Sequence, residues 1–239
     1  MLGWPRLTKG QHIVTFTCTG KNAASIGYNL GLDGLVLQRV AHERRGVATD
    51  SGSASPLAAK LRAIGSLGAR GATQLATLRA GLASPSVDER VAAAWALTQL
   101  TEAAQPAVAA LTKSLGDPDH VVRGLSALAL RDAGGVNDAA IDALAERLTD
   151  PDDGVRMASA WAIAAQGSRA MRVFQVLMAA GRAQPQHPHV QRAIADAFGA
   201  IGPQAKDALP VLEELAKGVR VRWNAVAAIK KVKGGSGAR

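Results

Sequence analysis

The chain has 239 residues and a formal net charge of +9, and 48% of its residues are apolar although only 3% are aromatic. This length suits one or two domains, and the single cysteine excludes a disulfide framework and a multi-cysteine zinc site. No apolar run approaches the roughly 18 residues of a membrane-spanning helix, so we expect a cytoplasmic protein with no membrane contact. A core so poor in aromatic residues must pack small aliphatic side chains closely, which favours helices.

The N-terminal segment, residues 1–55, differs in composition from the rest of the chain. It contains eight glycines, and its six Lys/Arg exceed its three Asp/Glu. Glycine-rich segments with scattered charge bury little apolar surface. We therefore predict that residues 1–55 form an N-terminal arm that is poorly ordered or lies outside the main fold.

A sequence repeat begins after this arm. Arg90, Arg123 and Arg156 are spaced by 33, and each precedes an apolar stretch. A second set of apolar residues recurs with the same period and falls at i, i+3 and i+7 within each unit, which is one face of a helix. Each unit therefore has a first and a second amphipathic helix, and stacked units would share a continuous core.

The predicted elements follow from these anchors in chain order. First helices are expected at about 56–67, 87–100, 120–132, 153–165, 188–200 and 219–232, and second helices at about 71–82, 104–115, 138–148, 168–180 and 204–217. Asp117 and Asp150 each precede a proline at a helix entry, where a carboxylate can accept free N–H groups. We assign Trp95, Trp161 and Phe198 to the core, because they occupy positions filled elsewhere by aliphatic residues. Phe174 replaces an aliphatic residue in the same way.

The positive charge is concentrated at the two ends of the chain. Residues 56–217 hold sixteen Lys/Arg and sixteen Asp/Glu, whereas residues 218–239 hold six basic residues and no acidic one. A protein that binds DNA along its length needs cations along its body. We therefore expect nucleic-acid contact, if the protein makes any, only at the basic C-terminal end.

The pattern Asp-Pro-Asp-x-x-Val-Arg, at 117–123 and 150–156, resembles the short HEAT repeat that is also found in phycobilin lyase subunits. The resemblance implies an all-α fold, an α-solenoid of helical hairpins stacked in a right-handed superhelix. The repeat domain would span 56–233, with about five and a half repeats, and 234–239 would be a flexible basic tail. The resemblance also implies a ladder of hydrogen bonds between repeats. Its expected members are Arg90, Asp117, Arg123, Asp150, Arg156 and Arg222.

In such a solenoid the second helices line the concave face, so their residues outside the core become candidates for partner binding. The candidates are Arg79, Gln105, Lys113, Asp138, Asp142, Glu146, Arg172 and Gln175. The sign of the charge changes along this set, from basic to acidic near 138–146 and back to basic near 169–182. That alternation suits a protein or peptide with its own charge pattern, although it is also compatible with an ordinary solvated face.

The expected function is a non-catalytic scaffold that acts as a monomer and binds a protein or peptide on its concave face. We identify no catalytic, cofactor-binding or metal-binding residues, because no acid and base groups converge in the pattern. Two alternatives stay open. One is a nucleic-acid binder similar to the HEAT-type DNA glycosylases, and the other is a chromophore-lyase or enzyme-accessory protein, which depends on similarity of fold alone.

Overall fold

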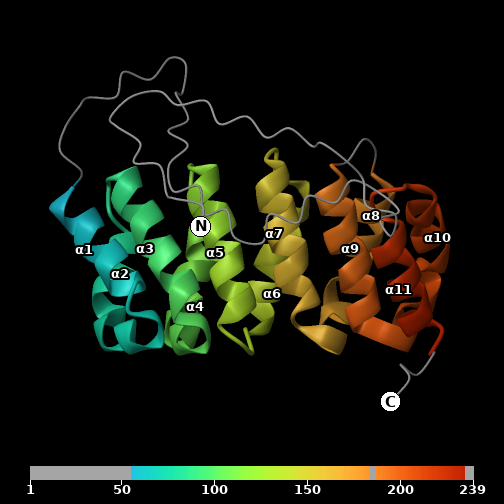
Figure 1. Ribbon diagram of the computed structural model, residues 1–239, viewed down its shortest axis with the longest axis horizontal. Coiled ribbons are helices and arrows are strands. Elements are labelled where there is room, and N and C mark those ends of the chain that lie inside the picture. The colour runs from blue at the N-terminus through green and yellow to red at the C-terminus, as the bar shows by residue number, and fades with distance from the viewer. Residues whose placement is uncertain (1–54, 184–186, 235–239) are drawn as a thin grey trace, which may run out of the picture. The chain divides into compact units, whose positions relative to one another are not determined.

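The computed structural model describes residues 55–183 and 187–234 (Figure 1). Its internal contacts divide the chain into Met1–Thr49 and Asp50–Arg239, and every described residue belongs to the second unit. The predicted arm at 1–55 and tail at 234–239 therefore lie almost entirely outside the described residues. Within those residues the structure is helical and has no strand.

Six helices form one layer and occupy the positions predicted for the first helices. They are α1 (Pro56–Gly65), α3 (Val87–Leu100), α5 (His120–Asp132), α7 (Asp153–Ala164), α9 (Pro188–Ile201) and α11 (Arg222–Val232). Each packs on the next one in this series, from α1 on α3 to α9 on α11. Figure 1 shows them side by side in chain order, which is the arrangement of an α-solenoid and confirms the predicted fold class.

The second helices form the other layer, and most of them begin with a tighter 3₁₀ segment. The α-helices are α2 (Leu75–Leu82), α4 (Val108–Ser114), α6 (Asp138–Glu146), α8 (Phe174–Arg182) and α10 (Leu209–Lys217). The 3₁₀ segments that precede them are η1 (Gly68–Gln74), η2 (Thr101–Ala107), η4 (Gly167–Val173) and η5 (Gly202–Ala208), whereas η3 (Arg147–Thr149) follows α6. The sequence predicted single continuous helices here, because periodicity alone does not distinguish a 3₁₀ turn from the start of an α-helix.

The turn between the two helices of a unit contains a residue with positive φ, and in the turn between α5 and α6 a second one, Gly135, follows it. Gly68, Gly134, Gly167 and Gly202 have φ values of 56°, 67°, 58° and 73°, at spacings close to one or two repeat lengths. Thr101 holds the same place in its unit, with φ 50° and ψ −129°. A β-branched residue in this conformation is strained, so the turn geometry is imposed by the packing of the two helices.

The helix entries differ in one detail from the prediction. The N-caps of α5 and α7 are Asp119 and Asp152, whose carboxylates accept from Val121 N at 2.9 Å and from Val155 N at 2.9 Å. Asp117 and Asp150, two residues earlier, accept instead from the backbone N–H of these caps, at 2.9 and 3.0 Å. Because Asp119 and Asp152 accept the hydrogen bonds of the first N–H groups in each helix, the carboxylates of Asp117 and Asp150 are available to bond to another unit.

The core is continuous through the array and consists mainly of alanine and leucine. Trp95 and Trp161 pack against it but keep part of their surface exposed, so they are core residues only in part. Phe174 and Phe198 are buried and meet edge to face, with ring centroids 5.9 Å apart, between α8 and α9. The many buried alanines leave room for neighbouring helices to approach each other closely.

Candidate partner-binding surface

Two guanidinium–carboxylate pairs join neighbouring units at their helix entries. Arg90 on α3 donates from Nε and Nη2 to the two carboxylate oxygens of Asp117, at 2.7 and 3.1 Å. Its Nη1 also donates to the carbonyl of Ser84, six residues earlier, at 3.0 Å. The hydrogen bond to Asp117 raises the pKa of Arg90, so the guanidinium stays charged while it connects two units.

The next pair repeats this geometry one unit further on. Arg123 on α5 donates to both oxygens of Asp150, at 2.8 and 2.9 Å, and to the carbonyl of Asp117 at 2.8 Å. Burial opposes the ionisation of Asp150, but the hydrogen bonds from Arg123 and the backbone of Asp152, with the charges of Arg123 and Arg147, lower its pKa. The Asp150 side chain is only 2% exposed, so this pair is nearly shielded from water.

The ladder stops after these two pairs, contrary to the expectation for Arg156 and Arg222. Arg156 bonds to the carbonyl of Asp150 and to Asp153 in its own unit, because position 183, where the next aspartate would stand, is alanine. Arg222 donates only to the carbonyl of Ala216, at 3.4 Å, among the described residues.

The first junction uses hydroxyl groups in place of an arginine. Ser55, the N-cap of α1, and Ser84 both donate to the carboxylate of Glu89 on α3. These two hydrogen bonds lower the pKa of Glu89. Ser84 therefore contributes to the polar edge of the array although it replaces the aspartate of the pattern.

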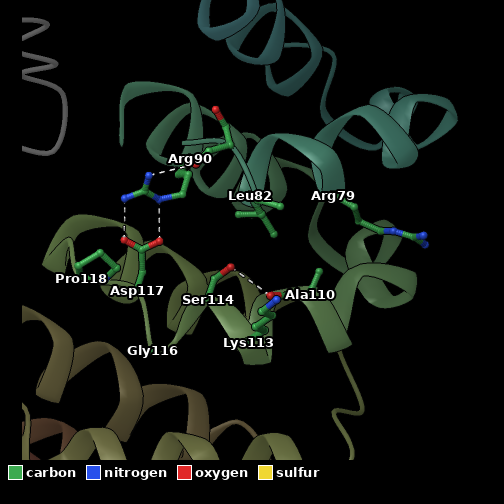
Figure 2. A pocket seen from close by; sticks show the side chains of 11 residues that line it. Arg79, Leu82, Arg90, Ala110, Lys113, Ser114, Gly116, Asp117 and Pro118 are labelled. Atoms are coloured by element: carbon green, nitrogen blue, oxygen red, sulfur yellow. Dashed lines mark hydrogen bonds and ion pairs between the residues drawn. The ribbon is translucent and has the colours of Figure 1, made fainter. Parts of the chain in front are cut away.

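A pocket of about 440 Å³ lies between α2 and α4, on the second-helix layer (Figure 2). Leu82 and Ala110 supply apolar wall, and Arg90 and Asp117 face each other at one end. Arg79 lies at the opposite end in Figure 2, and Lys113 also lines the pocket.

Arg79 and Lys113 are the two charged groups of this pocket that have no partner within the described part of the chain. Both side chains are exposed, and neither forms an ion pair or a side-chain hydrogen bond with another described residue. Arg90 and Asp117, in contrast, neutralise each other. A pocket with an apolar wall and two free cations can hold a carboxylate that lies next to an apolar group.

The acidic and basic segments further along the array are bonded to each other. Arg172 on η4 donates to both oxygens of Asp142 on α6, at 2.7 Å each, and to Asp138 at 3.3 Å. Arg169 donates to Asp138 at 2.8 Å and to the carbonyl of Val136 at 2.7 Å. The hydrogen bond from Arg172 lowers the pKa of Asp142. The acidic and basic residues that were predicted to face a partner therefore largely pair with each other.

All of the predicted surface residues lie on the second-helix side, but the structure divides them into separate groups. Their places are α2 for Arg79, η2 for Gln105, α4 for Lys113, α6 for Asp138, Asp142 and Glu146, η4 for Arg172 and α8 for Gln175. Glu146 pairs with its neighbour Arg147 at 3.3 Å, whereas Gln105 and Gln175 are exposed without side-chain bonds to other described residues. Arg79 and Lys113 line the same pocket, the one between α2 and α4.

Comparison with known proteins identifies the repeat. The sequence model of HEAT repeats matches residues 75–164 and again 141–230, which together cover more than half of the chain. The chain belongs to the HEAT-repeat family. No curated protein matches this HEAT-repeat chain significantly in sequence.

Solved structures share the arrangement of the HEAT array. An engineered protein is 24% identical with a TM-score of 0.59, over 75% of this chain and 90% of that one. A designed armadillo repeat protein in complex with the peptide (KR)4 is 21% identical with a TM-score of 0.59, over 73% and 91% of the two chains. The complex of CpcE and CpcF of phycocyanin lyase from Nostoc sp. PCC7120 gives 26% identity and a TM-score of 0.56, over 67% and 65%.

The described part of the HEAT array has neither a metal-binding cluster nor a membrane-spanning helix. In residues 55–183 and 187–234, no three His, Cys, Asp or Glu residues are grouped so that they could hold a metal ion. None of the helices in these ranges has the length and apolarity that crossing a membrane requires.

Proposed function

We propose that this HEAT-repeat protein is a non-catalytic scaffold that binds a protein partner on its second-helix layer, at the pocket between α2 and α4. The observation that carries the proposal is the pair of free cations, Arg79 and Lys113, beside the apolar wall of Leu82 and Ala110. An ammonium and a guanidinium that line the same pocket are suited to holding a carboxylate.

The partner segment would be an extended peptide with acidic and apolar residues. The designed armadillo repeat protein that shares this fold is in complex with the basic peptide (KR)4. In the HEAT-repeat protein the free charges at the pocket are themselves basic, so an acidic segment fits and a basic one is repelled. We further propose that the protein acts as a monomer in the cytoplasm.

The test compares two labelled peptides of the same length, alternating Asp-Leu and alternating Lys-Leu, by fluorescence anisotropy with the full chain. We expect the Asp-Leu peptide to bind, and the double variant Arg79→Glu/Lys113→Glu to weaken that binding by at least ~10-fold. Lys60→Glu/Arg62→Glu on α1 is the matched control, because it makes the same change of net charge on exposed side chains outside the pocket. Equal loss in both double variants would show that only net charge matters and would contradict the proposed site.

A second candidate, an accessory subunit of an enzyme, is favoured by one comparison. The phycocyanin lyase structure with 26% identity is itself a complex of two proteins, CpcE and CpcF. An accessory role of this kind predicts that the protein purified from its source carries a tetrapyrrole or the protein that accepts one. The visible absorbance spectrum of the purified protein, read beside its co-purifying chains, would distinguish this role from a scaffold that binds only peptides.

A further inference from the structure

Helix α11, the last of the described helices, has an apolar face that no other described helix covers. Helix α11 packs on α9 and α10, and no described helix comes after it. Trp223 is 82% exposed and Val226 is 49% exposed, and these residues lie one turn apart on the same side of α11. We call this side, with Trp223, Val226 and the exposed Ala227, the terminal face.

Comparison with an internal unit shows how such a face is normally packed. Residues 66 positions earlier, on α7, occupy the same places in the repeat: Met157 corresponds to Trp223 and Ala160 to Val226. Ala160 is fully buried and Met157 packs against the core, because α7 lies between α5 and α9. The terminal face is thus the side that the next helix covers elsewhere in the array.

Trp223 and Val226 are larger than their counterparts Met157 and Ala160, whereas Ala227 is smaller than its counterpart Trp161. A tryptophan exposed to this extent is unusual on a protein surface and is the residue type most enriched at the centres of interfaces. An alanine at position 226 would suit an end that faces only water, whereas valine adds apolar surface there.

The charge around this face determines which partner could cover it. Residues 215–239 contain seven Lys/Arg and no Asp/Glu, and two of these cations, Lys217 and Lys233, pair with Glu214 and Glu213. Lys230 lies on the same side of α11 as Trp223, and Arg220 lies in the turn that precedes the helix. Neither forms an ion pair with any described residue. A partner that buries Trp223 must therefore bring negative charge to the edges of the contact.

This requirement excludes a second copy of the chain and its own N-terminal segment. Two terminal faces would repel each other, because both are basic. The opposite end of the array is also basic, since residues 55–86 hold four Lys/Arg and no acidic residue. Residues 1–54 hold six Lys/Arg against three Asp/Glu.

We infer that the terminal face binds an acidic amphipathic helix of a different protein, which continues the helix layer beyond α11. The apolar side of that helix covers Trp223 and Val226, and its flanking carboxylates lie against Arg220 and Lys230. The contact repeats the packing of α7 against α9, with the next helix supplied by the partner.

The test uses a synthetic helical peptide of about 18 residues, with leucine on one face and glutamate on both sides of it. The full chain is titrated into the labelled peptide, and anisotropy gives the Kd. We expect Trp223→Ala and Val226→Asp each to raise the Kd by at least ~10-fold. Leu67→Asp is the matched control, because Leu67 is 48% exposed at a different place, and it should change the Kd by less than ~2-fold. The tryptophan emission should also shift to shorter wavelength on binding, and this shift should disappear in Trp223→Ala.

Several results would overturn the inference. They are the absence of binding at low salt, equal binding by Trp223→Ala, and equal binding of a peptide with lysine in place of glutamate. Self-association of the chain that Trp223→Ala abolishes would assign the face to a second copy and would also refute it. The shift of tryptophan emission that depends on Trp223 reports on the terminal face and should persist in Arg79→Glu/Lys113→Glu, so failure at the terminal face and failure at the pocket are separate outcomes.

Discussion

Replacing Asp150 by asparagine tests whether the ladder stabilises the array. The substitution keeps the size of the side chain but removes the charge that Arg123 holds through two hydrogen bonds of 2.8 and 2.9 Å. Arg123 would remain charged at a position where its side chain is 11% exposed. Removing one partner of a buried ion pair costs about 3–5 kcal/mol, because the other charge is left without compensation. Since Asp150 lies at the edge of the array, we expect the lower end, about 3 kcal/mol.

The measurement is urea unfolding followed by far-ultraviolet circular dichroism, with Asp142→Asn as the control. Asp142 and Arg172 have the same two-bond geometry, at 2.7 Å each, but their side chains are 47% and 46% exposed. Exposed ion pairs contribute little, so the control should unfold close to the urea midpoint of the unaltered chain. The two pairs share the two-bond geometry and differ mainly in burial, although Asp150 also accepts from Asp152 N–H and Arg172 also donates to Asp138.

A double variant completes this test. Arg123→Met combined with Asp150→Asn removes both charges, and its loss of stability should be smaller than the sum of the two single losses. If Asp150→Asn costs less than ~1 kcal/mol, or no more than Asp142→Asn does, the pair behaves as a surface ion pair and the reasoning from burial is refuted.

Three further changes test other features of the array by the same unfolding measurement. Gly65→Ala should destabilise the protein by about 2 kcal/mol, since the new Cβ would lie 2.8 Å from Ala96 Cα, and unchanged stability would contradict the close approach of α1 and α3. Thr101→Gly should stabilise it by about 1 kcal/mol by relieving the positive φ of 50°, and a loss would show that the side chain compensates the strain. The folded-state pKa values of Asp150 and Glu89 are lowered, so the stability that they contribute is present above about pH 4 and is lost as the pH falls through those values. An unfolding midpoint that does not change from neutral pH into that range would contradict this.

The positions of the helices could be predicted because the period of the sequence repeat matches the spacing of the buried residues. Buried alanines and leucines recur once in every repeat, and each predicted helix agrees with an observed one within a few residues, apart from the 3₁₀ starts. The helix caps were placed two residues too early, because Asp117 and Asp119 are the same residue type at the same entry. Only the three-dimensional arrangement distinguishes the carboxylate that bonds to the helix from the one that bonds to the next unit.

The pairing of charges on the second-helix layer was missed although the sequence contained a signal for it. The separation in sequence is 30 between Asp142 and Arg172 and 31 between Asp138 and Arg169, close to one repeat. In a solenoid, residues one repeat apart lie side by side, so opposite charges at that spacing neutralise each other. The apolar terminal face was missed for a different reason. Trp223 matches a half-buried position of internal units, and its exposure depends on whether another helix packs beyond α11.

The absence of an aspartate at position 183 affects how the row of units would respond to a pulling force. Two junctions between units contain an ion pair with two hydrogen bonds, Arg90–Asp117 in one and Arg123–Asp150 in the other. Each pair resists sliding of the units, because its two hydrogen bonds must break together. The junction between α7, α8 and α9 has no such ion pair among the described residues. It depends on apolar contacts, such as that of Phe174 with Phe198. Under tension along the array, apolar interfaces can slide gradually, because they have no directional bonds that must break together. We therefore expect the two junctions joined by Arg90–Asp117 and Arg123–Asp150 to part after the junctions that have no such pair, and the junction beside Ala183 is one of the latter.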